Sequence, residues 1–291
     1  MKPAFPSPYV AAALGALALA AAVTATSQEG REAGSRQLWD EEFVKARPAA
    51  PAPAAKAGAP RKTTAAASAG PSFVGVTLWR LEPAAEGTRA LTVEGEGRRW
   101  APMRAEVGTA IPEGQHVRVA VEASRPGFLY VVDRERYADG TTGDPVLVFP
   151  TRRIRGGENA VRPGKVVEIP DHGDQPPYFT LRRSRAGHEE EELLLLVAPE
   201  PLAEVTVGQD AQPLARAQVE EWERRWGGAH ARLESPGGPG RAYTAAEQEA
   251  ARSQTRLLTR GEPLPQTLYR VQGRAGSPAL VAVRLRIAPP R

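Results

Sequence analysis

The sequence predicts a mainly β fold: an antiparallel, β-sandwich-like domain with two α-helices inserted near its C-terminus, preceded by a signal peptide and a disordered linker. Short apolar runs recur every eight to fifteen residues after residue 71, separated by Gly, Pro, Asp and Asn clusters, and these indicate antiparallel strands. No helical pattern interrupts them before residue 203. Helical periodicity between residues 203 and 262 predicts the two inserted helices.

The first 27 residues have the organisation of a signal peptide. Lys2 precedes an apolar stretch, Val10–Val23, that is shorter than the roughly 20 residues needed to span a bilayer. Small residues fit cleavage after Ala25 or after Ser27. We therefore expect an exported protein, periplasmic or secreted. The alternative is an uncleaved N-terminal segment that tethers the chain to the inner membrane.

Residues 28–71 are expected to hold a short helix and then a linker. Leu38, Trp39 and Phe43 would share one side of the helix. The stretch after Arg47 has no apolar residue larger than Ala, so it cannot bury enough surface to offset the entropy of ordering. We expect an extended, Pro-stiffened linker that holds the following domain away from a membrane, a wall or a partner.

The composition excludes several kinds of chemistry. The 291-residue chain has no cysteine, which rules out disulfides, thiolate zinc sites and a lipid-modified N-terminal cysteine. The net charge is +4, and 38 basic residues are dispersed among 34 acidic ones without a dense basic stripe. Nucleic acid is therefore not expected as a partner.

The strand-like segments show the period-2 alternation of half-buried strands. In "VGVTLW" and "VRVAVEA" the valines occupy every second position. Further strand-like runs are "FLYVVD", "VLVF", "KVVEI", "YFTL" and "LLLLVA". The last run is apolar on both faces and should be a central strand. The acidic run Glu189–Glu192 before it is interpreted as a solvated loop that discourages edge-to-edge aggregation.

The two helices have recognisable ends. The first carries its apolar residues at i, i+4, i+7 and i+11, namely Ala215, Val219, Trp222 and Trp226, and Gly227 ends it. In the second, Thr244 and Glu247 form a capping box. The closing run "ALVAVRLRI" alternates again, so its strand should rejoin the main sheet. We expect one composite β domain over residues 72–291, with a core at 117–202, a helical insertion at 203–262 and closing strands at 263–291.

Four segments of this core resemble a known bacterial family. They are "VEASRPGFLYVVDRE", "DGTTGDPVLVFPTRRIRGGENAVRPGKVVEIP", "PPYFTLRRSR" and "LLLLVAPEPL". In order and spacing, over about residues 117–202, they are similar to the family called domain of unknown function 4384, and later segments look like the extension found in some exported members. The resemblance implies a β-rich extracytoplasmic module of the kind that accompanies proteases, kinases or envelope proteins. It implies no reaction and no catalytic residues.

These observations favour a non-enzymatic, exported interaction module that binds a protein or polymer of the bacterial cell envelope, without a cofactor. The alternative is an accessory subunit of an envelope hydrolase or secretion system, whose partner supplies catalysis. The four histidines, at positions 116, 172, 188 and 230, are widely spaced and are predicted to lie in loops or turns. None has a second histidine three to five residues away, so a zinc site has no local nucleus. No G-x-S-x-G motif is present.

Two stretches offer candidate ligand-binding residues. Trp100 stands beside two arginines in "GEGRRWAP", a combination found in glycan or peptide grooves, although a single buried Trp that anchors the core explains it as well. In "RRIRGGENAVRPG" the paired glycines would let the backbone approach an oxyanion near Arg152, Arg153 and Arg155. A long turn between strands is the alternative.

The hairpin tip between "FLYVVD" and "VLVFP" offers candidate metal ligands. Asp139 and Asp144, with backbone carbonyls, could bind Ca²⁺, but their spacing does not match a calcium loop. Asp-Gly and Gly-Asp pairs are ordinary residues of hairpin bends, so a turn without metal is the preferred interpretation. The first strand should lie inside the sheet, with its faces formed by Phe128, Tyr130 and Val132 and by Leu129 and Val131.

Overall fold

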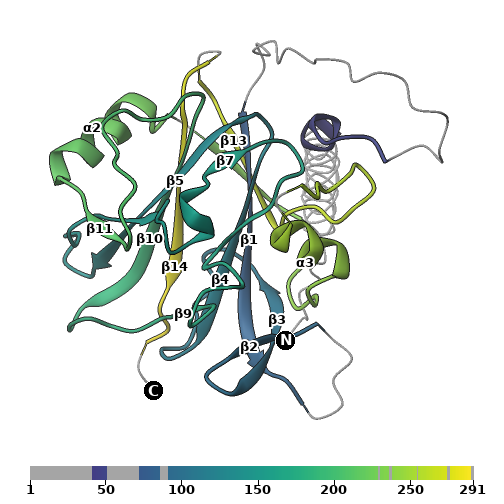
Figure 1. Ribbon diagram of the computed structural model, residues 1–291. Coiled ribbons are helices and arrows are strands. Elements are labelled where there is room, and N and C mark those ends of the chain that lie inside the picture. Colours follow the sequence, from purple (N-terminus) through teal and green to yellow (C-terminus); the bar gives the residue numbers. More distant parts are fainter. Residues whose placement is uncertain are drawn as a thin grey trace, which may run out of the picture. The chain divides into compact units, whose positions relative to one another are not determined.

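Two antiparallel sheets make up most of the computed structural model, so the predicted mainly β, sandwich-like fold is confirmed (Figure 1). The structure describes residues 41–50, 72–85, 91–228, 230–235, 238–253, 255–273 and 276–289. The predicted signal peptide and most of the predicted linker lie outside these ranges. The described residues from Phe43 onward belong to one compact unit.

The first sheet has the order β12-β13-β1-β3-β2, and β4 also pairs with β1, β8 and β9. Its strands are β1 (Ser72–Pro83), β2 (Val93–Gly95), β3 (Arg98–Ala105), β4 (His116–Ala123), β8 (Val167–Ile169), β9 (Phe179–Thr180), β12 (His230–Glu234) and β13 (Thr267–Val271). Strand β1 is central because β4 pairs along one of its edges, while β13 and then β3 pair along the other.

The second sheet has the order β11-β6-β5-β10-β14, with β7 paired to β5. Its strands are β5 (Gly127–Tyr137), β6 (Val146–Phe149), β7 (Ala160–Val161), β10 (His188–Ala198), β11 (Gln212–Pro213) and β14 (Ala279–Arg286). A short 3₁₀ turn, η1 (Arg155–Gly157), precedes β7. The predicted hairpin of β5 and β6 is confirmed, and β5 lies inside the sheet between β6 and β10.

The main core fills the space between the two sheets. Alternation along β5 sends Leu129 and Val131 into this core, while Tyr130 and Val132 join a second cluster on the opposite face of the sheet. The two predicted faces of β5 are therefore confirmed. The inward residues of β14 likewise alternate with its exposed arginines.

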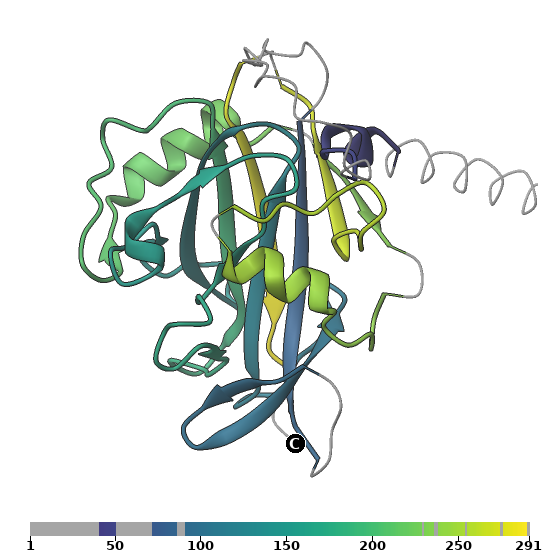
Figure 2. The same cartoon turned by 45° about the vertical axis from the view of Figure 1, so that its right-hand side comes forward.

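Helices α2 and α3 lie on the outer faces of the two sheets, on opposite sides of the sandwich (Figures 1 and 2). Helix α2 (Arg216–Trp226) buries Val219 and Trp222 against the second sheet. Helix α3 (Ala245–Arg252) covers the first sheet around Trp79, and the predicted Thr244–Glu247 capping box is present at its start. No helix among the described residues is long and apolar enough to cross a membrane.

Two local predictions were wrong. The acidic run Glu189–Glu192 is part of β10 and not a loop, because arginines on the neighbouring strands compensate its charge and allow Glu192 to be buried. His116, His188 and His230 lie in strands, and His188 is completely buried, whereas only His172 lies in a turn.

Candidate functional site

A cavity of about 530 Å³ opens at one end of the sandwich, where β1, β5 and β14 begin and β4 and β10 end. Its size falls within the range of ligand pockets. Its apolar lining comes from both sheets: Phe73, Val74, Phe128, Val161, Val197 and Ala279. An apolar group of a ligand or partner would lose contact with water there.

The chain is shaped locally for this opening. Gly127 starts β5 directly against the end of β10, and a Cβ at this position would lie 2.5 Å from the carbonyl oxygen of Ala198. On the other sheet, the hydroxyl oxygen of Ser124 accepts a hydrogen bond from the backbone N–H of Phe73 at 2.8 Å. Gly127 therefore lets β5 begin close to the end of β10, and Ser124 holds the start of β1 by a hydrogen bond. Both residues position strand ends that border the cavity.

The cavity's charged lining is positive. Arg162 is exposed and Arg125 half-buried, and burial lowers the pKa of Arg125 from its ordinary value. No aspartate or glutamate is among the described residues that line the cavity. A guanidinium near a low-dielectric wall attracts an anion more strongly than one in open water. The arrangement suits an apolar group that lies next to a carboxylate or another anion.

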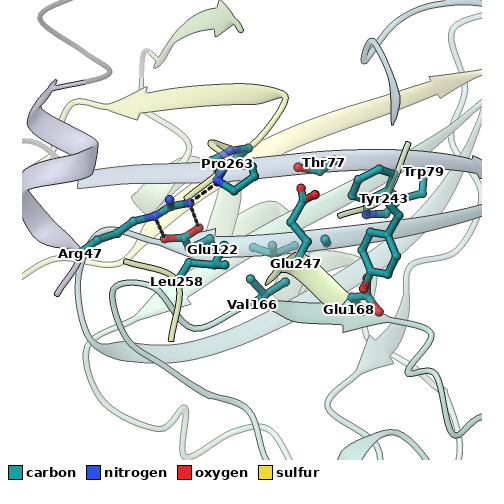
Figure 3. A pocket seen from close by; sticks show the side chains of 14 residues that line it. Arg47, Thr77, Trp79, Glu122, Val166, Glu168, Tyr243, Glu247, Leu258 and Pro263 are labelled. Atoms are coloured by element: carbon teal, nitrogen blue, oxygen red, sulfur yellow. Dashed lines mark hydrogen bonds and ion pairs between the residues drawn. The ribbon is translucent and has the colours of Figure 1, made fainter. Parts of the chain in front are cut away.

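A second, much smaller cavity lies between the first sheet and the layer formed by α3 (Figure 3). Its volume of about 20 Å³ is enough for roughly one water molecule. Trp79 lines this cavity, and its buried indole N–H has no hydrogen-bond partner among the described residues. The space is too small for a substrate.

Arg47 lines this small cavity, and several hydrogen bonds hold its guanidinium in place. It is 1 % exposed and donates through Nε and Nη2 to both carboxylate oxygens of Glu122, each at 2.7 Å. It also donates to the carbonyl oxygens of Glu262 and Pro263, each at 3.0 Å. Burial raises the pKa of Glu122, and the hydrogen bonds from Arg47 oppose that rise. These contacts fix the segment around Arg47 on the sheet.

Two further buried ion pairs complete the polar layer. Arg118 donates to Glu168 at 2.7 Å, and the hydroxyl of Tyr243 donates to the same carboxylate at 2.5 Å. Burial and the Glu168 carboxylate raise the pKa of Tyr243, which keeps its hydroxyl protonated. Arg104 pairs with Glu247. Each of these carboxylates is paired with an arginine, and the Arg104–Glu247 pair attaches α3 to the sheet.

Trp100 lies in β3, packed against Leu81 and Tyr178, and is 8 % exposed. The edge of its ring meets His116 at a centroid distance of 4.6 Å. It therefore anchors a small apolar cluster, which agrees with the alternative of a buried Trp in the core. It does not line the cavity between the sheets.

The candidate arginines after β6 differ in burial and in partners. The side chain of Arg155 is 1 % exposed and lies 3.9 Å from Asp171. Arg153 is exposed, donates to the carbonyl of Gln175 at 2.8 Å and lines a separate surface hollow. Arg152 is exposed as well. Of the three, only Arg153 lines that hollow, so the structure does not bring them together there.

The two aspartates of the hairpin tip have separate partners. Asp139 accepts hydrogen bonds from the backbone N–H and the hydroxyl of Thr141, at 2.9 and 2.6 Å, as in an Asx turn. Asp144 accepts a hydrogen bond from Arg216 at 2.8 Å. Asp139 therefore makes the contacts of an ordinary turn, and Asp144 forms an exposed ion pair.

The residues of the larger cavity were missed from the sequence. Arg125 and Arg162 lie in different loops, and only the pairing of β5 with β7 brings those loops to the same end of the sandwich. No local motif marks either arginine.

No family model, no curated protein and no solved structure matches this chain. The similarity to domain of unknown function 4384 therefore stays a prediction.

Proposed function

We propose that this chain is an exported, non-enzymatic interaction module that binds a protein or polymer of the bacterial cell envelope through the cavity between the two sheets. The observation that carries the proposal is the combination of an apolar lining with Arg125 and Arg162. This combination favours a protein segment that presents an apolar side chain next to a carboxylate.

Site-specific photocrosslinking tests the binding site. A photoreactive amino acid at Ser277, which lines the cavity, should form an adduct in envelope fractions, and the same probe at Asp139 on the hairpin tip should not. Reversing the cavity charge with Arg162→Glu should reduce the yield at least several-fold. The matched change Arg182→Glu, at another exposed arginine, should leave it unchanged. Equal adducts from both probe positions would contradict the proposal, and a polysaccharide adduct from Ser277 alone would change the class of occupant to a polymer.

Export has its own test. The mature protein isolated from its native host should begin at Thr26 or Gln28, as N-terminal sequencing would show. An intact Met1 in a cytosolic fraction would contradict export.

A further inference from the structure

The end of the second sheet away from the large cavity gathers acidic side chains on its inner face. Glu135 on β5 lies directly opposite Glu191 on β10, and Asp133 pairs with the next inward residue, Leu193. Because side chains alternate along each strand, all three carboxylates point to the same side as the sandwich core. His188 begins β10 beside them.

Two of these carboxylates have buried oxygens without a hydrogen-bond partner. The atoms are Oδ1 of Asp133 and Oε2 of Glu191. The Asp133 residue as a whole is half-buried, and its Oδ1 atom is shielded from solvent. No arginine or lysine in the described part of the chain forms an ion pair with either residue, and Nε2 of His188 lies 3.6 Å from Glu191. A buried polar atom without a partner destabilises the fold, so a bound cation would compensate these oxygens.

The geometry fits a single ion. Single ligand atoms of Glu135, His188 and Glu191 all lie within 4.8 Å of one another. Two oxygens bound to one Ca²⁺ at roughly 2.3–2.6 Å can be up to about 5 Å apart. A surface hollow lined by Glu135, Tyr137 and Ser184, and also by Arg185 and Arg216, reaches Glu135 from solvent.

Both ring nitrogens of His188 take part in hydrogen bonds, so the imidazole is not available as a metal ligand. Its Nδ1 accepts a hydrogen bond from the backbone N–H of Ser184 at 3.2 Å, so the neutral ring carries its proton on Nε2. That N–H donates to the carbonyl of Glu190 at 3.1 Å. Neither nitrogen offers a free lone pair, which leaves oxygen atoms as the ligands and favours a hard cation.

We propose that Glu135 and Glu191, with Asp133 next to them on the same face of the sheet, bind a hard divalent cation, Ca²⁺, between β5 and β10. Carboxylates, backbone carbonyls and water are the ligands Ca²⁺ prefers, and three carboxylates exceed the charge of one such ion. The ion would supply the partner that the two buried oxygens lack. The site is independent of the cavity at the other end of the sandwich.

The test uses the full chain, stripped of metal with a chelator and measured at about pH 8. Millimolar Ca²⁺ should raise the melting temperature of the wild-type protein by roughly 5 °C. The shift should disappear in Glu191→Gln and in Asp133→Asn. It should persist in Glu189→Gln, which removes the same charge from an exposed position on the same strand.

A second measurement does not depend on the stability of a variant. Tb³⁺, a luminescent substitute for Ca²⁺, should be sensitised by Tyr137, whose hydroxyl donates to Glu135. Excess Ca²⁺ should displace it. Absence of both the thermal shift and the luminescence would overturn the proposal, as would equal responses in the wild-type protein and in Glu191→Gln. A response to Zn²⁺ alone that His188→Gln removes would overturn the choice of a hard cation.

Discussion

Glu191 and Glu192 are neighbours on β10, and their side chains lie on opposite faces of the second sheet. On the outer face, Glu192 is 1 % exposed and accepts hydrogen bonds from Arg134 at 2.6 Å and Arg284 at 3.0 Å. Arg136 lies 3.4 Å away. Burial by itself would raise the pKa of Glu192, but Arg134 and its neighbours outweigh burial and hold that pKa below the ordinary value.

On the inner face, no guanidinium in the described part of the chain forms an ion pair with Glu191. Burial, followed by repulsion from Asp133 and Glu135, raises the pKa of Glu191 to about 8. Burial and Glu135 raise the pKa of Asp133 to about 7. The comparison shows that the arrangement of positive partners, more than depth of burial, decides whether a carboxylate in this sheet is held charged.

The largest loss of stability is expected from a substitution in the apolar core between the two sheets. Phe149 is fully buried in the core between the sheets, whereas Phe128 is only partly buried. Phe149→Ala should lower the free energy of unfolding by roughly 3–5 kcal/mol, measured by urea denaturation, because it leaves a cavity in the core. Phe128→Ala should cost clearly less. Equal losses would mean that Phe128 on β5 is packed as tightly as Phe149 on β6.

The next effect separates the two glutamates directly. Glu192→Gln leaves three arginines without their shared partner and should cost roughly 3 kcal/mol of unfolding free energy. Glu191→Gln removes a repelled carboxylate and, in a chelator, should change stability by less than about 1 kcal/mol, in the stabilising direction. If both changes cost the same, the contrast between the faces is wrong.

A smaller effect is expected at the hairpin tip. Changing Asp139 and Asp144 together to Asn should alter the unfolding free energy by less than about 1 kcal/mol, since both lie in an exposed turn. The Ca²⁺-dependent rise in melting temperature should be retained in this double variant. A sharp drop in melting temperature seen only with Ca²⁺ present would place the metal at the tip instead.

The smallest effect concerns a half-buried histidine, His116. His116 stacks on Tyr178 at a centroid distance of 4.0 Å, and burial lowers its pKa; Glu96 opposes this shift, while Arg182 and Arg98 add to it. The unfolded chain therefore takes up a proton on His116 before the folded chain does. Stability from this group is present above about pH 6.5 and is lost as the pH falls below it.

Urea midpoints measured at about pH 7 and pH 5 would show this loss. The wild-type protein should lose more stability than His116→Gln over that interval. An equal or larger loss in the variant would contradict a lowered pKa for His116.

The sequence was sufficient where the signal is local. Alternation in β5 and β14, the apolar stripe of α2 and the Thr244–Glu247 capping box each depend on residues a few positions apart. Such patterns follow from the periods of strands and helices. These elements were therefore predicted with their correct faces.

The candidate sites depend on contacts between distant residues. Taken alone, four consecutive glutamates suggest a solvated loop. The arginines that neutralise Glu192 lie on β5 and β14, 58 and 92 positions away, so the local sequence does not reveal them. The pairing of Glu191 with Glu135 depends on strand register, which no single segment encodes. Arg47 reaches Glu122 across 75 positions. Neither the acidic cluster nor the polar layer under α3 could be predicted from local patterns.

Glu191 has a raised pKa and its neighbour Glu192 a lowered one because, among the described residues, arginines pair with Glu192 and not with Glu191. Carboxyl ¹³C NMR of the full chain, titrated in the presence of a chelator, measures this directly. We expect Glu191 to titrate together with Asp133 well above the ordinary range, around pH 7 to 8, while Glu192 stays ionised below its ordinary pKa. Titration of Glu191 and Glu192 together, near the ordinary glutamate value, would contradict the account.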